Sequence, residues 1–78
     1  MKTTKKKELP QVVFDVGKRI ETIIKQKGLK RRDVAYEADL DIENLRKYIR
    51  GRQEMKISTL VKITHALKVD VGDLFKKR

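Results

Sequence analysis

The sequence predicts an all-α protein, a compact five-helix bundle with a central helix-turn-helix. Apolar residues recur at helical spacing along most of the chain, and no alternating pattern is long enough to indicate a strand. The second and third helical segments are separated by about three residues, which is typical of a helix-turn-helix. With 78 residues and no cysteine, the chain has room for one small domain that lacks disulfides and Cys-based zinc sites.

Three parts of the chain are expected to differ in order. Residues 1–9 are polar, lysine-rich and without apolar periodicity, so they are expected to form a flexible basic arm. The folded domain is expected over residues 10–76. Residues 77–78 then form a short basic tail.

The first helix is expected to begin at Pro10 or shortly after it and to end at Gly28. Lys25 and Lys27 lie near this end, where positive charge favours the negative end of the helix dipole. The apolar residues at helical spacing in this segment are Val13, Val16, Ile20, Ile23 and Ile24.

The second and third helices flank the predicted turn. Asp39 can adopt the left-handed backbone conformation that ends the second helix, and Asp41 can cap the third helix, which ends at Gly51. The apolar residues of these helices are Val34, Ala35 and Ala38 in the second and Leu45, Tyr48 and Ile49 in the third.

The fourth helix is expected from about Ile57 or Ser58 to Leu67. The fifth begins at Asp70, whose carboxylate is expected to pair with Asp73 three residues on. The residues expected to face inward are Ile57, Leu60, Ile63, Thr64 and Leu67 in the fourth helix, and the fifth helix carries Val71, Leu74 and Phe75.

Charge is the strongest feature of the composition. The chain holds 21 Lys and Arg against 11 Asp and Glu, which gives a net charge of +10. More than half of this excess lies in residues 1–8 and 76–78. The balance indicates an anionic partner such as nucleic acid, although tails of this kind can also serve only to keep a protein soluble.

Several functional classes are disfavoured by the residues present. No apolar run exceeds three residues, so neither a membrane span nor a secretory leader is expected, and the protein is predicted to be cytoplasmic. His65 is the only histidine and Ser58 the only serine, and neither has an evident partner nearby in sequence. The chain is therefore not expected to be an enzyme or to bind a metal or cofactor.

A family resemblance rests on the joint spacing of short motifs across residues 14–75. These are Gly17-Lys18-Arg19-Ile20, Lys27-Gly28-Leu29, Val34-Ala35, Leu40-Asp41, Leu45, Arg50-Gly51, Thr59-Leu60-Val61-Lys62-Ile63, Ala66-Leu67-Lys68-Val69 and Asp73-Leu74-Phe75. In this respect the chain resembles the Cro/C1-type (XRE) helix-turn-helix family of phage and bacterial repressors. The resemblance implies a third helix that lies in the major groove of double-stranded DNA, generally in a homodimer on a two-fold symmetric operator.

Under this resemblance the third helix is the one that reads bases. Isoleucine can contact a thymine methyl group, glutamate can accept from a cytosine amino group, and asparagine or arginine can meet purine edges. The same side chains could instead be ordinary solvated residues, and the sequence leaves open which of them reach a base. The candidate base-reading residues are Ile42, Glu43, Asn44, Arg46 and Lys47.

The candidate phosphate contacts include a departure from the family pattern. Family members commonly open the second helix with Ser or Thr followed by Gln, whereas this chain has Lys30 and Arg31 there. Cations at a helix N-terminus are disfavoured by the dipole unless a phosphate lies nearby. Tyr36, on the same helix, is compatible with phosphate contact or with partial packing. The candidate phosphate-binding residues are Lys30, Arg31, Arg32, Arg50 and Arg52.

A second departure is paired. Family members often carry Arg in the first helix and Glu in the third, which form a largely buried ion pair, and these positions match Ile24 and Ile49 here. Replacing both partners by apolar residues is often neutral or stabilising, whereas removing one leaves a buried charge. Ile24 and Ile49 are therefore expected to touch in the interior.

The predicted function is that of a DNA-binding transcriptional regulator, a repressor or autoregulator. Two alternatives remain open. One is the antitoxin of a toxin-antitoxin pair, which would also bind a toxin protein. The other is the controller of a restriction-modification system.

Overall fold

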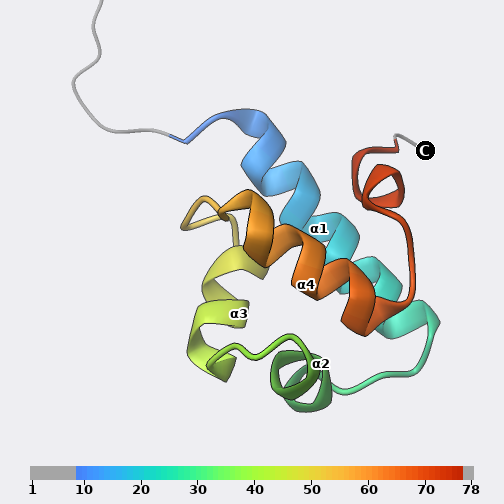
Figure 1. The fold of residues 1–78 in the computed structure, drawn as a ribbon. Coiled ribbons are helices and arrows are strands. Elements are labelled where there is room, and N and C mark those ends of the chain that lie inside the picture. The colour runs from blue at the N-terminus through green and yellow to red at the C-terminus, as the bar shows by residue number, and fades with distance from the viewer. Residues whose placement is uncertain (1–8, 77–78) are drawn as a thin grey trace, which may run out of the picture.

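The computed structural model describes residues 9–76, which form four α-helices and one short 3₁₀ helix (Figure 1). The elements are α1 (Gln11–Gln26), α2 (Arg31–Glu37), α3 (Ile42–Ile49), α4 (Ile57–Leu67) and η1 (Val71–Phe75). No strand occurs within the described range, so the all-α prediction is confirmed. The predicted basic tail and all of the predicted arm except Leu9 lie outside the described residues.

The predicted count of five helices is confirmed only for four α-helices, because the last element is a 3₁₀ helix of five residues, Val71–Phe75. Helices of the 3₁₀ type are generally short, because their hydrogen-bond geometry is poorer than that of an α-helix. Its start is held by the Asp70 backbone N–H, which donates to Asp73 Oδ2 at 3.0 Å. The hydrogen bond from Lys76 to the Asp73 carboxylate lowers the pKa of Asp73 from its ordinary value.

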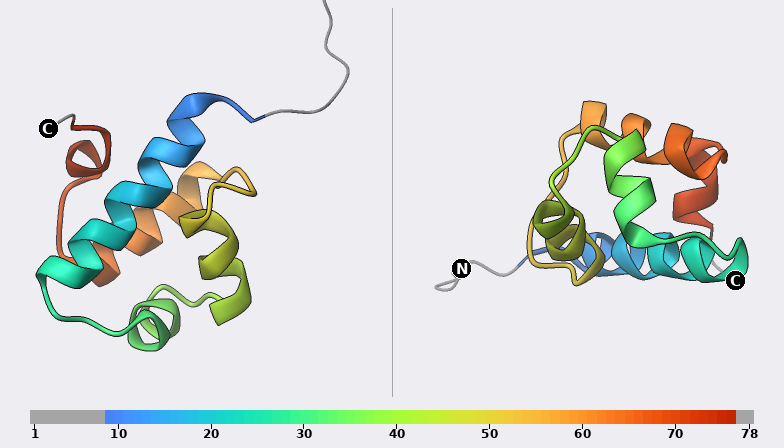
Figure 2. Two further views of the ribbon diagram at one scale, coloured as in Figure 1. Left: turned by 180° about the vertical axis from the view of Figure 1, so that it is seen from behind. Right: turned by 90° about the horizontal axis from the view of Figure 1, so that it is seen from below.

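The helices pack in pairs around one core. α1 packs against α3 and η1, whereas α4 packs against α2 and η1. The view from below shows α1 and α4 as two separate layers, with the other helices beside and between them (Figure 2). This arrangement leaves α2 and α3 together at one side of the molecule.

The helical periodicity predicts most of this core correctly. Residues from every element are buried, and those with no more than 1% exposure include Ile20, Ala38, Leu45, Ile63, Leu67 and Leu74. The prediction that Ile57 faces inward is wrong, because Ile57 is 79% exposed. It is the first residue of α4, so its side chain extends past the end of the core rather than into it. Val71 and Phe75 are also partly exposed, at 38% and 50%.

Left-handed residues end the helices as the sequence indicates. Gly28 has a φ of 65° and Asp39 a φ of 59°. Lys68, also at 59°, ends α4 in the same way although a side chain disfavours this conformation. The Lys27 ammonium, expected to complement the dipole of α1, instead donates to the Leu67 carbonyl at 2.9 Å. Lys27 therefore ties the end of α1 to the last turn of α4.

The two isoleucines at the positions where the resemblance implies an ion pair are both buried. Ile24 on α1 is 4% exposed and Ile49 on α3 is 8% exposed, and both belong to the hydrophobic core. Since α1 packs directly against α3, an isolated charge at either position would lack solvent. The expected direct contact between the two side chains stays a prediction.

Helix α1 approaches the end of α3 very closely at Gly17. A Cβ atom on Gly17 would lie 2.6 Å from the Ile49 carbonyl oxygen and closer still to that of Tyr48. Both obstacles are backbone atoms, which cannot rotate away as a side chain can. The approach of the two helices therefore requires glycine at this position.

We expect Gly17→Ala to destabilise the fold by about 1 to 3 kcal/mol, because overpacking outweighs the better helix propensity of alanine. Urea unfolding followed by circular dichroism measures this loss. Gly72→Ala is the matched control, since a Cβ there meets nothing within 4 Å. Equal stability of the Gly17 and Gly72 variants would contradict the close approach.

Candidate nucleic-acid interface

The segment from α2 to α3 forms a helix-turn-helix with a tight turn. The Leu40 N–H donates to the Ala35 carbonyl at 2.8 Å, and the Asp39 N–H donates to the Tyr36 carbonyl at 3.1 Å. These bonds satisfy carbonyls at the end of α2 while Asp39 turns the chain in the left-handed conformation. Leu40, the residue after Asp39 in the turn, packs against the core. The turn is therefore held both by backbone hydrogen bonds and by apolar packing.

Buried side chains fix the orientation of both helices. Each helix places an apolar face in the core, and the residues involved are Val34, Ala35 and Ala38 of α2 and Leu45, Tyr48 and Ile49 of α3. Figure 1 shows α3 at the edge of the molecule beside α2. The face of α3 opposite its apolar residues is therefore turned away from the core.

The five candidate base-reading residues are not equally accessible. Glu43, Arg46 and Lys47 are exposed, whereas Ile42 and Asn44 are half-buried. Ile42 packs against the hydrophobic core, which explains an isoleucine at this position without a thymine contact. Whether any of these residues touches a base stays a prediction.

Two of the candidate base-reading residues are bonded to each other. Arg46 Nη1 lies 2.9 Å from Glu43 Oε2, with side-chain exposures of 48% and 66%. An exposed pair one helical turn apart contributes only about 0.3 to 0.5 kcal/mol, so a base edge can displace it. The pair holds both side chains along the outer face of α3.

The predicted side-chain cap of α3 is wrong. Asp41 occupies the N-cap position, but its carboxylate makes no capping hydrogen bond. Its backbone carbonyl instead accepts from the N–H groups of Asn44 and Leu45 at 3.0 and 3.1 Å. The first turn is thus held by backbone bonds.

The five candidate phosphate-binding residues are all exposed and fall into two groups. Lys30, Arg31 and Arg32 lie at the start of α2 and line one hollow together with Ile42 and Arg46 of α3. Arg50 and Arg52 follow the other end of α3, which at eight residues is about 12 Å long. Cations therefore flank both ends of the candidate reading helix.

Sequence reasoning missed one acidic residue in this region. Glu21 Oε2 of α1 lies 2.7 Å from Arg31 Nη2 and 3.9 Å from Lys25 Nζ. The spacing of Glu21 and Lys25 along one helix could have indicated the second contact. Nothing in the sequence indicates the first, because the loop between α1 and α2 determines it.

Tyr36 is exposed and does not pack against the core. Its side chain is 84% exposed on α2, which excludes the alternative of partial packing. Contact with a phosphate stays open.

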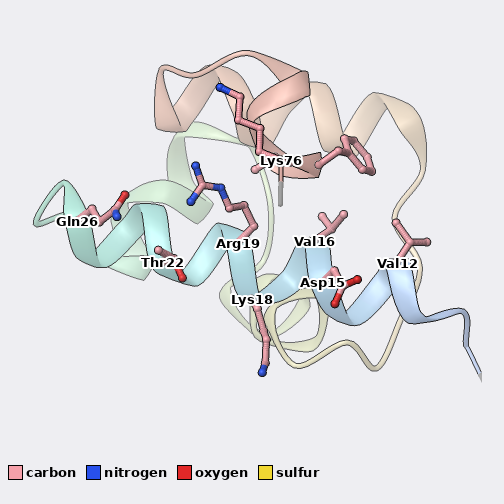
Figure 3. Close-up of a pocket in the computed structure, with 10 residues that line it drawn as sticks. Val12, Asp15, Val16, Lys18, Arg19, Thr22, Gln26 and Lys76 are labelled. Atoms are coloured by element: carbon pink, nitrogen blue, oxygen red, sulfur yellow. The ribbon is translucent and has the colours of Figure 1, made fainter. Parts of the chain in front are cut away.

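A second hollow lies away from the helix-turn-helix, between α1 and η1 (Figure 3). Arg19 crosses this region and donates from Nε to the Asp73 carbonyl at 2.9 Å. Val12 and Phe75, which are 47% and 50% exposed, line both this hollow and an adjoining one that reaches Met55 and Leu60 of the α4 side. An apolar surface thus joins the start of α1 to η1.

Residues 9–76 offer little for metal binding or for a membrane span. No group of three or more His, Cys, Asp or Glu residues in this range is placed to hold a metal ion. His65 is exposed on α4. None of the described helices combines the length and apolar character needed to cross a membrane.

Solved structures with the same fold include three regulators. The restriction-modification controller protein C.AhdI from Aeromonas hydrophila has a TM-score of 0.81 and 23% identity, over 85% of this chain and 100% of that chain. The clp gene regulator ClgR from Corynebacterium glutamicum has a TM-score of 0.81 and 26% identity, over 85% and 70% of the two chains. C.Esp1396I bound to a 25 base pair operator site has a TM-score of 0.75 and 26% identity, over 82% and 84%.

No curated protein sequence matches the chain, but a family profile does. The profile of the Cro/C1-type helix-turn-helix DNA-binding domain matches residues 19–76, which include the whole of α2, α3, α4 and η1. With that match, and with the helix-turn-helix geometry described above, the chain belongs to the Cro/C1-type helix-turn-helix family of DNA-binding proteins.

Proposed function

We propose that this protein is a transcriptional regulator, a repressor or autoregulator, that binds its operator as a homodimer and reads the sequence with α3. The observation that carries this proposal is the outer face of α3, where exposed Glu43, Arg46 and Lys47 lie between two groups of exposed cations. Such a face combines groups that recognise base edges with groups that bind phosphate.

The two sets of residues have different roles in this proposal. Contacts to phosphate supply affinity without regard to sequence, and contacts to base edges in the major groove supply specificity. The phosphate contacts are assigned to Lys30, Arg31, Arg32, Arg50 and Arg52. The sequence-reading contacts are assigned to Ile42, Glu43, Asn44, Arg46 and Lys47.

A more specific role is control of a restriction-modification system. A mutant of C.Esp1396I, a controller protein of that kind, is 26% identical to this chain. The alignment covers 88% of this chain and 86% of that chain. The similarity therefore extends over nearly the whole length of both proteins. A role as antitoxin requires in addition a toxin that binds this chain, and co-purification with a toxin encoded by a neighbouring gene would favour it.

The homodimer is assigned to the apolar surface that joins Val12 of α1 to Phe75 of η1, together with the exposed Val71 of η1. These side chains are between 38% and 50% exposed, and a two-fold partner would cover them. Related helix-turn-helix dimers bind half-sites about one helical turn, or 34 Å, apart.

Selection of bound sequences from a random duplex pool tests the proposed function directly. We expect a consensus with two-fold symmetry. Binding of the selected duplex should fall with salt at a log-log slope of about −4.5 for each protein copy, because five phosphate contacts each contribute about −0.9. Equal recovery of all sequences, or a slope near zero, would refute the proposal.

Substitutions should separate affinity from specificity. We expect Arg31→Ala to weaken binding to selected and unrelated duplexes by the same factor, since it removes a phosphate contact. Glu43→Ala should instead change the preference at particular bases by about 1 to 3 kcal/mol. Competition titrations with single-base variants of the selected duplex measure both effects. An unchanged consensus after substitution of all five sequence-reading residues would show that α3 does not read the operator.

The dimer surface can be tested without DNA. We expect Phe75→Ser to shift the protein from dimer to monomer in sedimentation velocity, because the exposed apolar ring supports association. Tyr36→Ser is the control, since it removes an exposed aromatic side chain from α2 instead. A wild-type protein that stays monomeric at high concentration, or equal effects of the two substitutions, would contradict the assignment.

A further inference from the structure

The guanidinium of Arg31 already has an anionic partner within the protein. Arg31 Nη2 donates to Glu21 Oε2 at 2.7 Å, which is a short, charge-assisted hydrogen bond. The partner comes from α1, ten residues earlier in the chain, and not from the helix-turn-helix. Arg31 and Glu21 keep 44% and 33% of their side-chain surface exposed, so a ligand can reach the pair.

Most of the charged residues around this pair are cationic. The hollow that the pair borders is lined by five Lys or Arg residues and two acidic residues, Glu21 and Asp33. It also includes Ile42 and Arg46, so it opens beside the first turns of α3. A phosphate that approached α3 from this side would meet the Arg31 guanidinium and the Glu21 carboxylate together.

We propose that Glu21 competes with a DNA phosphate for Arg31 and so restrains the affinity of the protein for DNA. A carboxylate and a phosphate oxygen both bind the N–H groups of a guanidinium. While Arg31 donates to Glu21, that donor is withheld from phosphate, and the carboxylate also repels the phosphate.

The size of this restraint follows from the exposure of the pair. Solvent and salt screen a pair that is one-third to one-half exposed, and pairs of this kind correspond to a change of about two- to fivefold in an equilibrium constant. Phosphate contacts are independent of sequence. Loss of Glu21 should therefore strengthen binding to all duplexes by a similar factor.

This inference rests on the proposed function, and it can fail independently of it. The test compares Glu21→Gln, Arg31→Gln and the double variant by fluorescence anisotropy on the selected duplex and on an unrelated duplex across a salt series. We expect Glu21→Gln to tighten both complexes by about two- to fivefold and to bring the log-log salt slope nearer to the full five-contact value of about −4.5 per copy. In the Arg31→Gln background, Glu21→Gln should give no more than the control effect.

Two control variants separate the effect of the Glu21–Arg31 pair from the general effect of changing one charge. Glu37→Gln removes an exposed carboxylate from α2 and measures the general effect of one negative charge. Lys25→Gln removes the other cation near Glu21, at 3.9 Å, and leaves Arg31 in place. Thermal unfolding should show that all the variants stay folded, because every substituted side chain is at least partly exposed.

Three outcomes would overturn the inference. Weaker binding by Glu21→Gln would show that the carboxylate orients Arg31 for DNA instead of competing with it. A gain no larger than that of Glu37→Gln, or a gain that persists in full without Arg31, would show only a general charge effect. Wild-type protein that binds no duplex DNA would refute the proposed function itself.

Discussion

The close contact between α1 and α3 is the constraint on which the rest of the structure depends. At Gly17 the backbone of α1 reaches the carbonyl groups of Tyr48 and Ile49 with no room for a Cβ atom. The Phe14 ring, one turn earlier, lies against Gly51 directly after α3. The end of α3 is thus held by backbone and ring contacts, which leave it little freedom to rotate. The direction in which the outer face of α3 points follows from this contact and from the burial of its apolar face, since hydrogen bonds within a helix do not orient it in the fold.

The elements and the core were predictable from the sequence because they depend on local rules. Helical spacing identified the buried faces of α1, α2 and α3, and the left-handed geometry at Gly28 and Asp39 follows from residue type. Features at the ends of elements were less predictable. Ile57 fits the periodicity of α4 but lies beyond the core, and Asp41 has a capping residue type whose side chain makes no cap. The exposure of Ile57 and the missing cap of Asp41 both depend on the path of the chain next to the helix and not on residue type.

The candidate site was predictable in its residue types but not in its pairings. A helix start with Lys30, Arg31 and Arg32 is electrostatically unfavourable, and within α2 only Asp33 of the first turn offsets it. The structure adds an internal compensation from Glu21, across the loop that joins α1 to α2. Lys27 shows the same kind of long-range contact, since its ammonium reaches the end of α4 and not that of α1. Contacts between side chains distant in sequence require the packed fold, which is why residue patterns alone did not indicate them.

The buried isoleucines change what defines the geometry between α1 and α3. A buried Arg and Glu at these positions would fix the helices through directional hydrogen bonds, at the expense of removing two charges from water. Ile24 and Ile49 avoid that desolvation, being 4% and 8% exposed, but apolar burial is non-directional and tolerates sliding of one helix over the other. Gly17 supplies a steric restriction, because the α1 backbone already lies so near the Tyr48 and Ile49 carbonyl groups that the two helices cannot come closer at this point. In this protein, steric fit at a glycine therefore helps to orient α3 against α1, and this orientation depends on shape more than on charge.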